Sequence, residues 1–335
     1  LPGWALALAL GRRGLRSVTL APALSLGLWT LTALVVDRLG LRWGVLPLVV
    51  VCAVLAAGVL LLRRRVAPLD DPALADDADR WASPTLLAGA AGSVLAVALW
   101  SRHLKNVLMS PDAISQTFDN VFHLNVIRYI AETGDPGPWL ARGLDPAASS
   151  TIFYPTAWHQ LAALALPAAE ASVAHASNAT LWVVVALFWP LSALELTLAL
   201  GVRSPGAVAS VGVLSASFSA YPFLMMDWGV LYPNLLSYAA IPSLIAVLGP
   251  RLARGPGGGP LVLPAVAGIL LLLGVAVAHP NGALLAFALL LPAILLGIVS
   301  AVRDLRRPEA RFRAALWCGA AVLTLGLGVL AWNRA

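Results

Sequence analysis

Charged residues are scarce in this chain of 335 residues: Asp, Glu, Lys and Arg together make up only 11%. A soluble domain carries about 25% charged residues. Hydrophobic residues reach 60%, and the mean hydropathy is +0.85. The composition excludes an ordinary soluble globular protein and indicates a chain that lies mostly within a lipid bilayer.

Cysteine and lysine are nearly missing as well. Cys52 and Cys318 both lie inside apolar runs, which argues against a disulfide framework and against a thiol-based metal site. Lys105 is the sole lysine, and the formal net charge of +6 comes from arginines clustered between apolar runs. Such clusters are typical of loops that set membrane topology, so we expect no nucleic-acid partner.

Apolar runs near the length of about 20 residues that spans a bilayer recur along the whole chain. They are continuous blocks of Leu, Ala and Val, so they predict helices, whose backbone groups are satisfied within the segment. We therefore predict an all-α, polytopic transmembrane helical bundle of about 9–10 spans. The predicted spans are 17–36, 43–62, 84–100, 178–200, 206–226, 234–249, 261–278, 282–302 and 314–332, with a partial span at 1–10.

The cations segregate when alternate loops are assigned to the cytoplasm, as membrane topology requires. Fifteen of the 22 then lie on the cytoplasmic side: Arg12, Arg13, Arg16, Arg63, Arg64, Arg65, Arg80, Arg203, Arg251, Arg254, Arg303, Arg306, Arg307, Arg311 and Arg313. The external seven are Arg38, Arg42, Arg102, Lys105, Arg128, Arg142 and Arg334. The assignment predicts a multi-pass protein of the plasma membrane.

This segregation holds only if the short apolar stretch 157–168 does not cross the bilayer. Its length suits a re-entrant or interfacial helix. Residues 101–177 then form one long external loop, which is the candidate functional element. Residues 66–83 are predicted to be a solvated acidic cytoplasmic linker. The whole of 1–335 is predicted to be a single transmembrane domain and a fragment of a longer chain.

Acid, amide and imidazole groups recur at helical spacing within residues 110–123 of this loop. A helix that begins at Pro111 would place Asp112, Gln116, Asp119 and His123 on one stripe. The helix dipole would explain Asp112 in the first turn, whereas it would give Asp119 no reason to lie in mid-helix. Asp119 is therefore the preferred functional acid, and Asp112 is the second candidate.

A carboxylate beside the outer leaflet can act as a general base toward an incoming hydroxyl. An imidazole one turn away can tune that acid or neutralise a phosphate. Two acids with one histidine could also bind a divalent cation, Mg²⁺ or Mn²⁺, so that alternative stays open.

Further polar residues fall on the same predicted side. They are Tyr154, His159, Asp227, His279 and Asn281. Tyr154 is typical of an interface anchor, and solvation in a short turn would explain Asp227. The tight turn 279–282 accounts for Asn281 but not for His279. We include all five as candidate substrate-binding residues, together with His123 and Gln116.

Glu195 is the one acid predicted to lie within a span, toward its cytoplasmic end. Intramembrane acids either pair with a cation or belong to an ion path. The sequence leaves both interpretations of Glu195 open.

The runs Asp112 to His123, Tyr129 to Gly134, Tyr154 to His159 and His279 to Asn281 resemble an uncharacterised actinobacterial integral membrane family. The layout of that family is similar to the glycosyltransferase-C superfamily, in which an acid in an external loop acts as base and a polyprenyl-phosphate sugar is the donor. The resemblance implies Asp119 or Asp112 as base, with His123, His159 and His279 near the donor phosphate. Here the loop follows the third or fourth span rather than the first, and no C-terminal soluble domain is present.

These observations lead to the hypothesis of a glycosyltransferase that moves a sugar from a polyprenyl-phosphate donor to a cell-envelope glycan or lipid on the external face. Membrane lipids would be its other partners. The alternatives are a lipid or glycan transporter or flippase, and a non-catalytic scaffold of an envelope-assembly complex. A transporter predicts polar groups near the middle of the membrane and broken spans in both halves, whereas most of the polar signal here is at one face.

Overall fold

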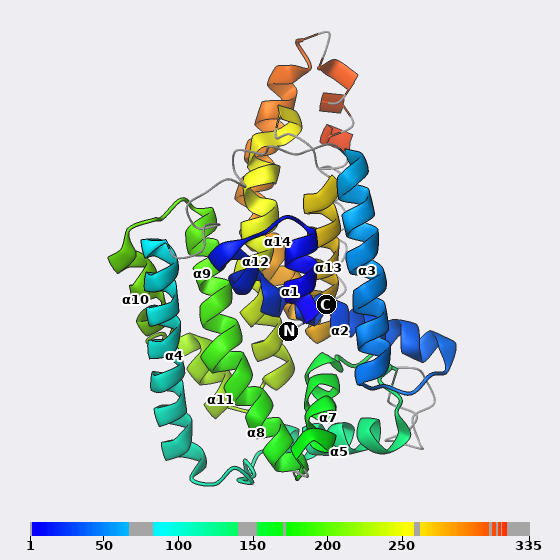
Figure 1. Ribbon diagram of the computed structural model, residues 1–335, viewed down its shortest axis with the longest axis vertical. Coiled ribbons are helices and arrows are strands. Elements are labelled where there is room, and N and C mark those ends of the chain that lie inside the picture. The colour runs from blue at the N-terminus through cyan, green and yellow to red at the C-terminus, as the bar shows by residue number, and fades with distance from the viewer. Residues whose placement is uncertain are drawn as a thin grey trace.

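The computed structural model describes residues 2–66, 83–139, 153–169, 172–257 and 262–307, and beyond these 310–312, 314–315 and 317–319. Every element in these ranges is helical (Figure 1). The helices are α1 (Pro2–Ala9), α2 (Gly14–Leu39), α3 (Val45–Val66), α4 (Pro84–Leu108), α5 (Phe118–Thr133), α7 (Ala157–Ala169), α8 (Val173–Val183), η3 (Val184–Phe188), α9 (Trp189–Ala199), α10 (Pro205–Ser215), η4 (Ser219–Leu224), α11 (Met225–Asp227), α12 (Tyr232–Arg254), η5 (Gly255–Gly257), α13 (Val262–Ala278) and α14 (Pro280–Asp304).

Seven helical runs in the described part of the chain are long and apolar enough to cross a membrane. They are α2, α3, α4, the run Val173–Ala199, the run Pro205–Asp227, α12 and α14. The 17 residues of α13 form a shorter apolar helix at another predicted span. The prediction of a polytopic, all-helical membrane protein is confirmed.

Glycines allow neighbouring helices to approach closely. A Cβ on Gly212 of α10 would lie 1.8 Å from the carbonyl oxygen of Gly92 on α4, so no larger residue fits at this crossing. Gly27 of α2 meets the backbone of Leu270 on α13 in the same way. Lipid tails are as apolar as the helix surfaces, so close packing of this kind replaces the hydrophobic effect as the force that holds the helices together.

The centre of the bundle is built on α2 and α12. Most residues of both helices are buried, whereas α3 and α4 expose most of their apolar side chains at the periphery. The side chains of Leu24, Leu28 and Leu236 are wholly buried in the main core. This arrangement suits a bundle whose outer helices face lipid.

The two ends of the bundle carry different loops, because successive spanning helices run in alternating directions. The turn at Gly11 packs on the guanidinium group of Arg63, and the Ser300 hydroxyl donates to the carbonyl oxygen of Arg254. These contacts bring predicted cytoplasmic segments together at one end, which we call the arginine end. The opposite end carries α5 and α7 (Figure 1), and we call it the loop end.

Helix α7 has 13 residues, which corresponds to about 20 Å, against about 30 Å for the hydrocarbon core. It packs on α5 and α8 at the loop end and is not among the helices long enough to cross. Its length agrees with the prediction that 157–168 does not span the bilayer.

Several sequence predictions fall outside the described residues. They concern the linker over 67–82, Arg80, Arg142, Arg313, Arg334 and most of the span 314–332.

We expect the loop end to face the outside of the cell. In a background with Cys52→Ala and Cys318→Ala, a cysteine in place of the exposed Asn125 on α5 should react with a membrane-impermeant maleimide in intact cells. The matched Ser204→Cys at the arginine end should react only after permeabilisation. The reverse pattern would overturn the predicted orientation and every site assignment that depends on it.

Candidate functional site

The polar stretch 110–123 is not one helix, which corrects the sequence prediction. Helix α5 begins at Phe118, and the residues before it are held by bonds from amide side chains to backbone oxygens. Asn178 of α8 donates to the carbonyl oxygens of Pro111 and Ala113, and Asn120 donates to that of Ser115. Such bonds compete with the helical pattern, so the backbone here remains non-helical.

Asp119 consequently lies in the first turn of α5 and not in mid-helix as predicted. The helix dipole favours an acid there, so this position alone does not require a functional role. Asp119 is nevertheless solvent-exposed, and it acts electrostatically on the neighbouring His123 and Tyr154. An exposed carboxylate beside a buried polar cluster is accessible to a substrate.

Asp112 is not on the stripe of Asp119 and His123 either. Its carboxylate accepts a hydrogen bond from the Ser172 hydroxyl, just before α8, and lies 4.0 Å from His175 Nδ1. The Ser172 side chain also caps α8 by accepting from the backbone N–H of His175. Asp112 therefore has a local structural role at the start of α8.

Two histidines from distant parts of the chain form a buried pair. His123 Nδ1 of α5 lies 2.9 Å from His159 Nε2 of α7, and His123 Nε2 lies 3.2 Å from the carbonyl oxygen of Val230. The Val230 oxygen can only accept, so His123 Nε2 carries a hydrogen. The Nδ1 of neutral His123 then accepts from His159 Nε2–H. Within the described residues, His159 Nδ1 has no hydrogen-bond partner.

Aromatic rings enclose this pair. Tyr232 stacks on His123 with ring centroids 5.7 Å apart, and Trp158 stacks on the other side of Tyr232 at 4.6 Å. Tyr154 lies 5.7 Å from His159 and contacts Phe122 edge-on. The pair is thereby shielded from water, with His123 exposed by 3% and His159 by 0%.

Burial controls the ionisation of the cluster. It lowers the pKa of His123 to about 4, although the Val230 carbonyl and the charge of Asp119 oppose the shift. Burial and the neighbouring His123 lower the pKa of His159 well below its usual value. Burial, with a smaller contribution from Asp119, raises the pKa of Tyr154. Both imidazoles are therefore uncharged at neutral pH and supply no positive charge to a phosphate.

The turn between α2 and α3 holds α5 and α7 together, and sequence reasoning missed it. The Trp43 indole N–H donates to the carbonyl oxygen of Gln160, and its backbone N–H donates to that of Gly134. Arg42 donates to the carbonyl oxygen of Glu132. A tryptophan next to glycine at a span boundary is a typical interface anchor, and that signal could have identified this contact.

The remaining candidates do not join the histidine pair through any contact within the described residues. Gln116 is exposed and donates to the carbonyl oxygen of Ile114. His279 caps α14, because its Nδ1 accepts from the backbone N–H of Asn281. This bond supplies the local reason for histidine in the turn that the sequence did not reveal. Asp227 and Asn281 are exposed at the loop end.

The positions of the candidate acids and histidines do not support a metal centre. Among the described residues, no group of three or more His, Cys, Asp or Glu side chains is placed to hold an ion. The sequence left open a divalent cation bound by Asp112, Asp119 and His123. That alternative assumed one helix from Pro111 to His123, but the helix begins only at Phe118.

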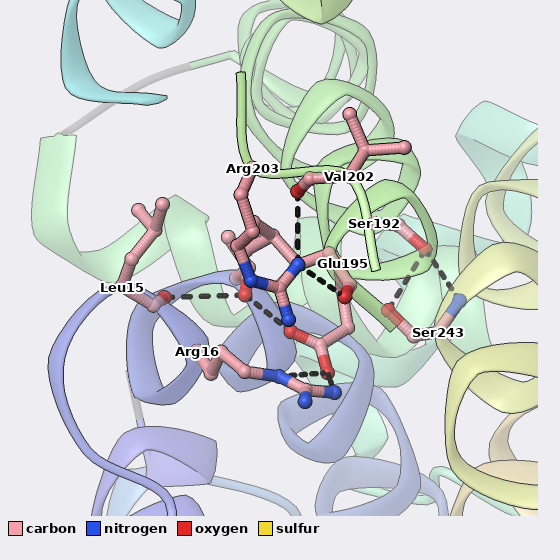
Figure 2. Close-up of polar contacts among 9 residues, drawn as sticks. Leu15, Arg16, Ser192, Glu195, Val202, Arg203 and Ser243 are labelled. Atoms are coloured by element: carbon pink, nitrogen blue, oxygen red, sulfur yellow. Dashed lines mark hydrogen bonds and ion pairs between the residues drawn. The ribbon is translucent and has the colours of Figure 1, made fainter. Parts of the chain in front are cut away.

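Glu195 is paired, which decides between the two interpretations of this intramembrane acid (Figure 2). Its carboxylate accepts from Arg16 Nη2 at 2.8 Å and from the Thr19 hydroxyl at 2.5 Å, and the Glu195 side chain is completely buried. Arg203 lies beside this pair and donates to the carbonyl oxygens of Leu198 and Val202 at the end of α9. The cluster joins α2 to α9 at the arginine end.

The fold and the polar clusters define a class: a multi-pass helical membrane protein with a buried histidine pair at one end of the bundle and a buried ion pair toward the other. Over residues 1–335 the chain matches the model of a family of unknown function, DUF6541, and it belongs to that family. No curated protein and no solved structure matches it.

The histidine pair predicts a pH dependence of stability. The unfolded chain binds protons below about pH 6.5, whereas folded His123 resists protonation down to about pH 4, so stability should fall as the pH drops through this window. A shift of this size corresponds to roughly 3 kcal/mol. Melting temperatures in detergent micelles between pH 7.5 and 4 should show a shallower slope for His123→Gln/His159→Gln. Identical slopes would show that the pair does not resist protonation.

Proposed function

We propose that this protein is a membrane glycosyltransferase that transfers a sugar from a polyprenyl-phosphate donor to a cell-envelope acceptor at the external face. The observation that carries the proposal is the position of Asp119: an exposed carboxylate at the loop end, close enough to the buried, uncharged imidazole of His123 to act on it electrostatically. A general base needs access to the acceptor hydroxyl, and the exposed position of Asp119 provides it.

In the proposed reaction Asp119 accepts the proton of an acceptor hydroxyl. The hydroxyl oxygen forms a bond to the anomeric carbon of the donor sugar, while the bond from that carbon to the phosphate oxygen breaks. Polyprenyl phosphate leaves with the electron pair of that bond. His123 and His159 would position α5 against α7 and exclude water, since both are buried and neutral.

The apolar surroundings of Asp119 support a lipid-linked substrate. Phe118 is almost fully exposed and Val121 is 60% exposed, so α5 presents apolar side chains next to the carboxylate. An amphipathic helix of this kind is suited to lie at the membrane interface. A substrate that carries a sugar on a lipid would then meet Asp119 from the bilayer.

A transporter would need an intramembrane acid that can exchange partners. Glu195 lies inside the bundle but is already paired with Arg16 and Thr19. Ion and substrate paths need groups that can exchange partners near the midplane, whereas this acid is held by three donor hydrogen bonds from α2.

The proposal is tested with purified full-length protein in nanodiscs, synthetic polyprenyl-phosphate sugars and an extract of envelope glycans and lipids. We expect release of polyprenyl phosphate together with a glycosylated acceptor. Binding of the donor without any release, across a panel of sugars and acceptors, would favour a transporter or a scaffold.

A further inference from the structure

A groove between α4 and α8 lies apart from the histidine pair, and the sequence assigned it no role. It encloses about 270 Å³ between Ser101, Leu104, Lys105, Leu108 and the residues that face them on α8. From the geometry of this groove we propose that it binds a membrane lipid with an anionic phosphate headgroup, with the phosphate beside Lys105 and one acyl chain between the two helices.

The walls of the groove are two matching helix faces, together with Met109, Ser110 and Pro111, which follow α4. On α4 they are residues 101, 104, 105 and 108, and on α8 they are residues 175, 178, 179 and 182. Each set follows the spacing of a single helix stripe, so the groove runs along both helix axes. Such a channel is shaped for a chain and not for a compact solute.

The inner end of the groove is closed and apolar. The Trp182 indole N–H donates to the Ser101 hydroxyl at 2.8 Å, which joins the two helices and uses the polar atoms at that end. Leu104, about one turn along α4 from Ser101, continues the apolar wall from this end. With its polar groups paired, this end offers a surface for an acyl chain and little for a headgroup.

The outer end of the groove, toward the end of α4, carries its lysine. Lys105, the sole lysine of the chain, is exposed there, and His175 lies in the facing wall. The Asn178 amide is not available, since it donates to the carbonyl oxygens of Pro111 and Ala113. Asp112 approaches His175 Nδ1 at 4.0 Å, so Lys105 is the group that can bind an added anion.

The surroundings favour a lipid over a soluble anion. Helix α4 lies at the edge of the bundle (Figure 1), and most of it is exposed where lipid would cover it. Basic side chains at the headgroup level attract anionic lipids, while their apolar neighbours retain the chains. The volume is below the range of about 300–1,000 Å³ typical of complete small-molecule sites, which suits a headgroup and the first part of one chain.

This inference does not rest on the proposed function, because lipid binding is measured without any transfer. Purified protein in phosphatidylcholine nanodiscs is titrated with phosphatidylglycerol, and bound lipid is counted by native mass spectrometry. Lys105→Gln should weaken binding about fivefold, the contribution expected of one basic residue near a membrane surface. Ala179→Trp, which fills the groove without changing its charge, should abolish the retained lipid.

The matched control is Arg102→Gln, which removes an exposed cation from the neighbouring position of α4 that does not line the groove. We expect it to keep wild-type binding. An equal loss in Arg102→Gln would contradict the proposal by showing general surface attraction. Displacement of the lipid by inorganic phosphate alone, or unchanged binding in Ala179→Trp, would contradict it as well.

Discussion

Asp119→Asn is expected to lower the rate of sugar transfer by about 10²–10⁴-fold while the protein stays folded and inserted. The substitution keeps the shape of the side chain but removes the group that accepts the proton. It also removes a negative charge from the first turn of α5, which costs only about 0.3–1 kcal/mol. Transfer rates and melting curves of the same preparations separate the two effects.

The matched control is Glu132→Gln, which changes another exposed acid at the opposite end of α5. It should retain wild-type activity. Asp112→Asn removes the acceptor of the Ser172 hydroxyl and should lower stability without a comparable loss of rate. Full activity in Asp119→Asn, with Asp112→Asn inactive, would transfer the base to Asp112. Activity in the double variant would defeat the general-base mechanism.

Arg16→Met should destabilise the protein by about 3–5 kcal/mol, because it leaves the Glu195 carboxylate buried and without its cation. The exposed fraction of the Glu195 side chain is 0%, so water cannot replace the lost partner. Unfolding in detergent, followed by helical circular dichroism, measures the change. The control Arg64→Met alters an exposed arginine in the last turn of α3, also at the arginine end, and should have a small effect.

The double variant Arg16→Met/Glu195→Met should recover most of this loss. Replacing both members of a buried pair by apolar residues of similar size is often neutral, whereas removing one partner is costly. A double variant as unstable as Arg16→Met would mean that the hydrogen bond from Thr19 to Glu195, and not the ion pair, dominates at this position.

The spans could be predicted because they depend on local composition. Continuous apolar runs that match the bilayer thickness specify helices irrespective of their neighbours, so nearly every predicted span coincides with a described helix. The segregation of arginines likewise needs no tertiary information.

The site could be predicted only in part, because its contacts link segments that are distant in sequence. Spacing alone favoured a helix from Pro111, but the Asn178 side chain from α8 binds the backbone there and prevents it. The sequence placed His123 and His159 on the same side of the membrane without showing that they bond to each other. The role of Lys105 depends on α8, which faces it across the groove.

The central claim, that the loop end is a site for a lipid-linked sugar, is tested most directly by a cryo-electron microscopy structure. The full-length protein would be prepared in nanodiscs with a non-hydrolysable polyprenyl-phosphonate sugar. We predict density for the sugar at the loop end, with its anomeric carbon facing the Asp119 carboxylate across the space of one hydroxyl group. Density for the analogue between the helices near the middle of the bundle, remote from Asp119, would contradict the account.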